Sequence, residues 1–148
     1  MGTKRLEQNK QSYFDSLVTT DRFTTLYPQG LSPEQYIGAL NTNAGDVLSQ
    51  AERNGLVNDL KSGAKSRGQV LRAVAEDADL NSAEFNRAFV LMQYFGYLRR
   101  NPDDLPDTNF DGYNFWLSKL KEFGGNFIQA EMVKAFLSSD EYSKRFGQ

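Results

Sequence analysis

The sequence predicts an all-α fold, because apolar residues recur every three or four positions and related segments recur about every 57 residues. No segment shows the alternation of an amphipathic strand. We therefore expect one all-α domain over residues 1–148, with 32–89 and 90–148 as two related units and 1–31 as the tail of a preceding unit.

The repeat is clearest where two distant stretches align without a gap. LVTTDRFTTLY begins at Leu17, and FLSSDEYSKRF begins at Phe136. Each has a pair of small hydroxyl residues, an acid, and two aromatic residues four positions apart. A third copy, NSAEFNRAF, has Phe85 at the first aromatic position, and YIGALN at Tyr36 parallels YFGYLR at Tyr94. Repeated helical units of this kind cover one another's apolar faces.

Start and stop signals mark the elements of the first unit. Ser32 followed by Pro33 is typical of a helix N-terminus, and Ser49 with Glu52 forms a capping-box pattern. The glycines of KSGAK and, in the second unit, of EFGGN stand where a helix ends in a left-handed residue.

The segment NSAEF, with a small polar residue ahead of Glu84, predicts the start of a helix that leads into the second unit, and apolar residues then recur as far as Leu98. Gly96 interrupts this helix, as Gly38 interrupts the corresponding helix of the first unit. A glycine inside a helix costs about 1 kcal/mol relative to alanine. We expect a close helix crossing at both glycines, with a bulky side chain resting on the bare backbone.

Composition excludes several classes of function. The chain has no cysteine and no histidine, which removes disulfides, thiolate metal sites and imidazole proton shuttles. The net charge is −2 and both signs are interspersed, so we expect no binding to nucleic acid. No apolar run is long enough for membrane insertion, and none near the start resembles a signal peptide. If the protein is exported, the signal lies outside this chain.

One stretch resembles a calcium loop. In DTNFDGYNFW, Asp107, Asn109 and Asp111 occupy alternate positions and a glycine follows, as in the first half of an EF-hand loop, where the carbonyl of Tyr113 would be the next ligand. The acid expected at the twelfth position is Ser118, so the strongest ligand is missing. The alternative is structural: Asp111 caps the following helix, and its neighbours form Asx turns.

The candidate binding residues are aromatic side chains and one arginine around this loop. Trp116 and its neighbours Tyr113 and Phe115 form an aromatic group that would suit a glycan or a protein partner, and Tyr97 and Arg100 end the preceding helix. Each has a structural alternative. Adjacent helix residues point in different directions, so Trp116 packs in the core in the simpler interpretation, and Arg100 is favoured at a helix C-terminus by the dipole.

The second unit resembles a known bacterial family. YLRRNPDD, Gly112, the Phe115–Trp116 pair, Gly124 and AFLSSDEY match the pattern of the domain of unknown function 4214 family, which is akin to the phycobilisome linker repeat. Upstream, LSPEQYIGALNTNAGDVLSQAERNGLV resembles the longer helical form of this domain that ends large envelope proteins of soil bacteria. The first unit lacks the Pro-Asp and Trp elements.

The resemblance implies a non-catalytic interaction or attachment module of a larger bacterial surface or secreted protein. Its expected partners are another protein, neighbouring domains of the same chain or a glycan, and we expect no enzyme activity and no cofactor except a possible calcium ion. The alternative is a calcium-dependent binding domain, in which the loop over residues 103–113 is ordered by metal and contacts a glycan or a protein.

Overall fold

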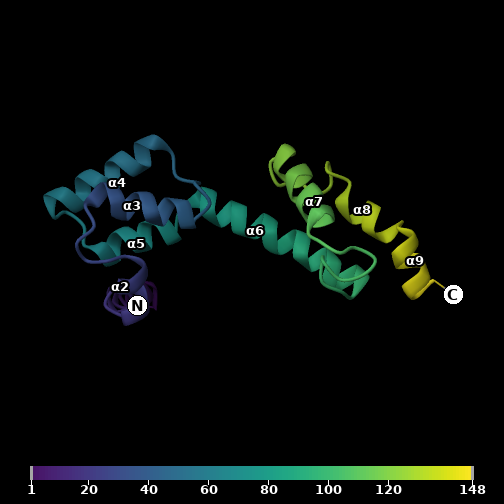
Figure 1. The fold of residues 1–148 in the computed structure, drawn as a ribbon, viewed down its shortest axis with the longest axis horizontal. Coiled ribbons are helices and arrows are strands. Elements are labelled where there is room, and N and C mark those ends of the chain that lie inside the picture. Colours follow the sequence, from purple (N-terminus) through teal and green to yellow (C-terminus); the bar gives the residue numbers. More distant parts are fainter. Residues whose placement is uncertain (1, 148) are drawn as a thin grey trace. The chain divides into compact units, whose positions relative to one another are not determined.

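The computed structural model describes residues 2–147, and over those residues it contains helices and no strand (Figure 1). The predicted all-α fold class is therefore confirmed. The chain divides into two compact parts between Asn81 and Ser82, which we call unit 1 and unit 2. This division falls inside a helix, whereas the repeat pattern places boundaries after residues 31 and 89. The boundaries taken from the repeat stay a prediction.

Unit 1 consists of helices of 6 to 16 residues joined by short connections. Its helices are α1 (Gly2–Leu17), α2 (Asp21–Leu26), α3 (Pro33–Asn43), α4 (Gln50–Ser62), α5 (Arg67–Ala75) and the first turn of α6 (Ala78–Gln93).

Three of these helices begin at a serine that forms a capping box. The serine side chain accepts a hydrogen bond from the backbone N–H three residues later, and the side chain of that later residue accepts one from the serine N–H. The pairs are Ser32 with Gln35, Ser49 with Glu52 and Ser66 with Gln69. The first two helix starts confirm the sequence prediction. Gly63 adopts a left-handed conformation (φ 74°) and ends α4, as its position after the helix predicts.

The core of unit 1 surrounds Tyr36, which is fully buried. Its ring packs edge-to-face against Tyr27, with centroids 5.9 Å apart, and the guanidinium of Arg67 lies 3.8 Å from its centroid. The Tyr36 hydroxyl donates a hydrogen bond to the Arg67 carbonyl (3.0 Å). Apolar side chains from α3, α4 and α5, such as Ile37, Leu56 and Val70, complete this core.

A glycine allows α1 to pack closely against α5. A Cβ atom added at Gly68 would lie 3.0 Å from the Cα of Asp15 and would collide with the Asp15 carboxylate. The predicted crossings at Gly38 and Gly96 are wrong, because a Cβ at either position would meet nothing within 4 Å. The close crossing of unit 1 therefore lies at Gly68, which the sequence analysis did not single out.

Unit 2 contains the rest of α6, followed by one π-helix and three α-helices. These are η1 (Tyr94–Leu98), α7 (Asp111–Glu122), α8 (Met132–Leu137) and α9 (Asp140–Phe146). No described helix in either unit has the length and hydrophobicity needed to cross a bilayer.

Helix α6 begins earlier than expected. The Asp77 carboxylate accepts hydrogen bonds from the N–H groups of Asp79 (2.9 Å) and Leu80 (3.1 Å), so the helix starts at Ala78. The start predicted from NSAEF is therefore too late, because the Asp77 cap lies about one turn upstream.

The core of unit 2 is aromatic. Tyr94 and Phe136 pack edge-to-face at 5.1 Å, and Val90, Leu120 and Met132 are fully buried around them.

The two stretches that align without a gap also adopt the same local structure. Thr20 caps α2 and Ser139 caps α9, each by accepting a hydrogen bond from the N–H three residues later.

Candidate functional site

The loop over residues 101–110, between η1 and α7, begins with an abrupt change of chain direction. The π-helix η1 ends at Leu98, and its C-cap residue Arg99 has a left-handed backbone (φ 54°) and donates its N–H to the carbonyl of Tyr94. Because an arginine rarely adopts this conformation, the turn needs support from packing. The next residue, Arg100, is buried, with 8% of its surface exposed.

The Arg100 side chain binds two carboxylates. Its Nε and Nη2 lie 2.6 and 3.0 Å from the two carboxylate oxygens of Glu141 on α9. Nη2 also donates to Asp107 in the loop, at 2.7 Å. This is a bidentate pair with Glu141, and Nη2 also forms a second ion pair with Asp107. The planar guanidinium, with its several N–H donors, is suited to this arrangement.

The same guanidinium also holds the backbone of the loop. Nη1 donates to the carbonyl oxygens of Asn101 (3.0 Å), Pro102 (3.2 Å) and Asp104 (3.0 Å). Arg100 therefore fixes the loop to itself and to α9. We call Arg100, Asp107 and Glu141 the arginine clamp.

Electrostatics in the clamp favour the charged form of Arg100. The hydrogen bond to Glu141 raises the pKa of the guanidinium above its usual value, although burial acts in the opposite direction. Burial also raises the pKa of Tyr94, whose ring centroid lies 5.2 Å from the Arg100 guanidinium. Arg100, a candidate binding residue, is thus engaged inside unit 2 rather than presented to solvent.

The candidate calcium ligands are also engaged by protein groups. Asp107 pairs with Arg100, while Asn109 accepts a hydrogen bond from the Asp111 N–H (2.8 Å) and donates its amide N–H to the Asp111 carboxylate (3.0 Å). Tyr113 lies on α7. Among residues 2–147, no three acidic side chains gather closely enough to hold a metal ion. The calcium site stays a prediction.

The Asx turn expected here is present, because the Asn109 side chain bonds to the backbone two residues later. Asp111 is the first residue of α7, and the preceding Phe110 holds the N-cap position without a side-chain hydrogen bond. The prediction that Asp111 is the N-cap is therefore wrong by one residue.

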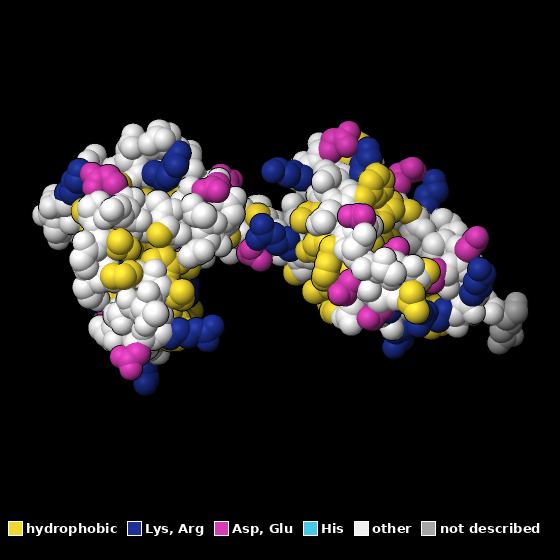
Figure 2. Space-filling view, viewed as in Figure 1, with side chains coloured by type: hydrophobic (Ala, Val, Ile, Leu, Met, Phe, Trp, Pro, Cys, Tyr) yellow, Lys and Arg dark blue, Asp and Glu magenta, His cyan; other side chains and the backbone are white. Residues whose placement is uncertain are grey.

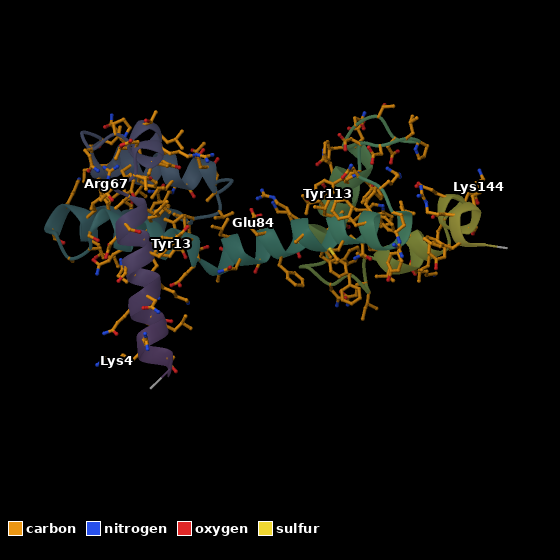
Figure 3. All side chains as sticks on the ribbon, turned by 90° about the horizontal axis from the view of Figure 1, so that it is seen from below. Lys4, Tyr13, Arg67, Glu84, Tyr113 and Lys144 are labelled. Carbon is orange, nitrogen blue, oxygen red and sulfur yellow. The ribbon has the colours of Figure 1, made fainter. Side chains whose placement is uncertain are left out.

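The aromatic candidates divide between core and surface. Trp116 packs against the core, with its ring 5.7 Å from that of Phe136, whereas its neighbour Phe115 is 54% exposed. Tyr113 lies against α6 (Figure 3) and donates its hydroxyl to the Arg87 carbonyl at 3.2 Å. The half-buried Tyr97 meets Tyr142 edge-to-face, at 6.2 Å between ring centroids.

Burial raises the pKa of the Tyr113 hydroxyl above its ordinary value. Of the candidate binding residues, Phe115 therefore presents the largest free apolar surface. Trp116, Tyr97 and Tyr113 contribute mainly to packing within unit 2.

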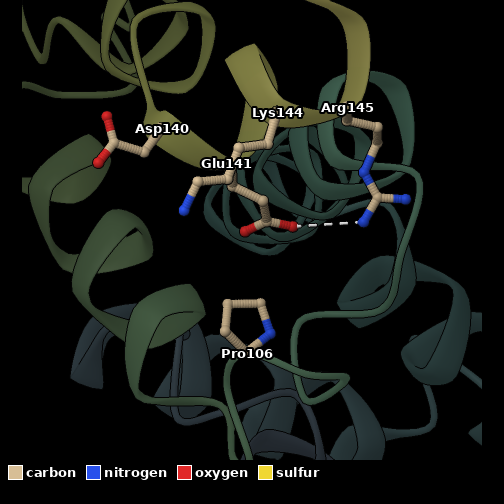
Figure 4. A pocket seen from close by; sticks show the side chains of 5 residues that line it. All are labelled: Pro106, Asp140, Glu141, Lys144 and Arg145. Carbon is tan, nitrogen blue, oxygen red and sulfur yellow. Dashed lines mark ion pairs between the residues drawn. The ribbon is translucent and has the colours of Figure 1, made fainter.

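A shallow hollow of about 560 Å³ lies beside the clamp (Figure 4). It is lined by Pro106 from the loop and by Asp140, Glu141, Lys144 and Arg145 from α9. Glu141 pairs with Arg145 at 3.6 Å across its wall, in addition to the bonds with Arg100. The hollow has charged walls of both signs and no converging pair of free acids.

Sequence reasoning missed Glu141, the partner that explains why Arg100 is buried. The residue belongs to the segment FLSSDEYSKRF, which aligns with the repeat, and to AFLSSDEY, which carries part of the family resemblance, but neither pattern indicates a partner for Arg100. Two opposite charges 41 positions apart give no periodic signal, so only the fold brings them together.

Comparison with known proteins identifies no relative of this chain. No family model, no curated protein and no solved structure matches this chain. The resemblance to the domain of unknown function 4214 family therefore stays a prediction.

Proposed function

We propose that this chain is a non-catalytic interaction and attachment module of a larger bacterial surface or secreted protein. Its partner is another protein or a neighbouring domain of the same parent chain. The contact surface lies in unit 2, around the first turns of α7, where Phe110 and Phe115 are 48% and 54% exposed. The family resemblance of unit 2 supports the cellular setting, and the exposed aromatic residues support the contact surface.

The observation that carries the proposal is the unequal exposure of apolar side chains. Of the large apolar side chains that residues 2–147 leave exposed, Leu6, Tyr13 and Leu26 lie in unit 1, and the other eleven lie in unit 2. Figure 2 shows such side chains reaching the surface of unit 2 among charged residues. Exposed apolar patches often mark interaction sites, and aromatic residues are enriched in such sites.

The arginine clamp supports the same function. It holds the loop over residues 101–110 against α9 by hydrogen bonds to three backbone carbonyls. A loop fixed in this way keeps Phe110 and the start of α7 in one arrangement, so a partner would not have to order them on binding.

Site-specific photocrosslinking tests the proposal. A benzophenone amino acid replaces Phe115, or replaces Tyr13 as a matched control, because both are exposed aromatic residues on helices. The variants are produced in the organism that encodes the chain. The expected result is one discrete protein adduct from position 115 and none from position 13.

The adduct must also be reproduced with purified components. The purified partner should bind the chain, and Phe115→Ser with Phe110→Ser should weaken binding at least tenfold, whereas Tyr13→Ser should leave it unchanged. Hot-spot aromatic residues commonly have effects of this size. Equal adducts from both positions, or binding insensitive to the Phe115 and Phe110 changes, would overturn the proposal.

A further inference from the structure

A second apolar surface of unit 2 is formed where α6 meets the turn that leads into α8. The rings of Phe85 and Phe89 stack with centroids 6.2 Å apart, and Phe89 lies 4.9 Å from Phe127. Ile128 follows Phe127 in the chain, and Met92 lies one helical turn beyond Phe89. We call these five residues the Phe85 face.

Most of the Phe85 face is open to solvent. The exposed fractions are 65% for Phe85, 60% for Met92, 38% for Phe127 and 74% for Ile128. With about 200 Å² for a large side chain, these exposures correspond to roughly 470 Å² of surface. The largest apolar patch of a typical monomer is about 300–600 Å² and is often functional.

We propose that the Phe85 face is the interface of a homodimer, in which it packs against the same face of a second copy of this chain. The area is the first argument. A standard interface buries about 800 Å² on each partner, of which about 57% is apolar, or roughly 460 Å². The Phe85 face matches this requirement without further apolar surface.

The charges around the face are the second argument, and they favour a second copy over a charged partner. Glu84 pairs with Arg87 on α6 beside Phe85, and Glu131 pairs with Lys134 at 3.0 Å beside Ile128. These flanking charges are neutralised within the chain. Two identical faces therefore approach without like-charge repulsion, whereas a strongly acidic or basic partner would find no opposite field.

A two-fold interface also fits the shape of the patch. In such an interface both copies contribute the same residues, so a row of aromatic side chains on one helix can pack against the same row of the second copy. A hollow of about 410 Å³, lined by Phe127, Ile128 and Val133 among others, lies at one edge of the face.

This inference goes beyond the proposed function, and the residues of the Phe85 face differ from the proposed contact residues Phe110 and Phe115. If the chain forms no dimer, the crosslinking result at Phe115 is unaffected. If crosslinking at Phe115 finds no partner, the test of the dimer is equally unaffected.

Sedimentation velocity between 5 and 200 µM tests the dimer. The wild-type chain should pass from monomer to dimer over this range. Phe85→Glu and Ile128→Glu should each raise the dissociation constant on the order of 100-fold, because each places two unpaired charges in the apolar interface. Leu105→Glu is the matched control, since Leu105 is 78% exposed in the loop before α7 and should leave the dimer intact.

The methionines give a second measurement that does not depend on the charged variants. In a chain with ¹³C-labelled methionine methyl groups, the Met92 signal should shift with concentration, whereas that of Met132, which is fully buried in the core, should not. A monomer at 200 µM, or a dimer that survives both Phe85→Glu and Ile128→Glu, would overturn the proposal.

Discussion

Arg100 and Glu141 join segments that are 41 residues apart, with Nε of the arginine 2.6 Å from Oε1 of the glutamate. The contact fastens the last helix, α9, to the end of η1. Because the Arg100 side chain is only 6% exposed, its charge depends on Glu141 and Asp107 for compensation. A buried charge that loses one partner is strongly destabilising.

We therefore expect Glu141→Gln to destabilise unit 2 by about 2–3 kcal/mol, since the neutral amide keeps the shape but not the charge. Trp116 is the single tryptophan of the chain and lines the same small cavity as Arg100 and Glu141, so urea unfolding followed by its fluorescence measures the effect. Glu131→Gln, which removes an exposed ion pair with Lys134, is the control and should change stability by less than about 0.5 kcal/mol. Equal effects of the two substitutions would contradict the clamp.

Two glycines in unit 1 should respond to alanine in opposite directions. Gly68→Ala places a Cβ against the Asp15 backbone and should destabilise unit 1 by about 1–3 kcal/mol through overpacking. Gly38→Ala adds a methyl group to open space inside α3 and should stabilise the unit by about 0.5–1 kcal/mol. Calorimetric unfolding measures both. If Gly38→Ala instead destabilises the unit, the result would support the close helix crossing that the sequence predicts at Gly38.

The local parts of this fold could be predicted from the sequence, because they depend on a few neighbouring residues. The helix starts at Ser32 and Ser49 and the left-handed glycine after α4 need only their own turn. The start of α6 was misplaced because two capping signals compete within one turn, and Asp77 is the one used. The π-helix before Arg99 has no signal that periodicity can detect.

The arrangement of the candidate site could not be predicted in the same way. The spacing of Asp107, Asn109 and Asp111 suggests metal ligands, but their orientation depends on Arg100, and the burial of Arg100 depends on Glu141. The contact between Arg100 and Glu141 joins residues that are far apart in the sequence, so this arrangement exists only in the folded chain. The helix pattern still indicates that Phe115 and Trp116 separate between surface and core, because adjacent residues of a helix point in different directions.

The calcium prediction has a direct test. Because Asp107 is held by Arg100, and Asn109 and Asp111 bond to each other, we expect millimolar calcium to leave the melting temperature unchanged relative to a chelator. A ligand at 100 times its dissociation constant would stabilise the native state by about 2.7 kcal/mol, which a thermal melt detects easily. A rise of several degrees that disappears in Asp107→Ala would instead support a metal-ordered loop.

Tyr36 should make unit 1 sensitive to alkaline pH. Burial raises the pKa of its hydroxyl from 10.0 to about 12. As pH rises, the unfolded state therefore loses this proton before the folded state does. The stability linked to this group is therefore fully present below pH 10 and is lost as pH rises toward 12, by roughly 2 kcal/mol.

Tyr36→Phe separates this effect from packing. At pH 8 the variant should be less stable by about 1 kcal/mol, because it lacks the hydrogen bond to the Arg67 carbonyl. Near pH 12 the order should reverse, since phenylalanine has no proton to lose. Urea unfolding followed by circular dichroism at the two pH values measures this, with Tyr13→Phe as the control because its ring is 62% exposed. A difference between wild type and Tyr36→Phe that stays constant with pH would show that the buried hydroxyl does not govern alkaline stability.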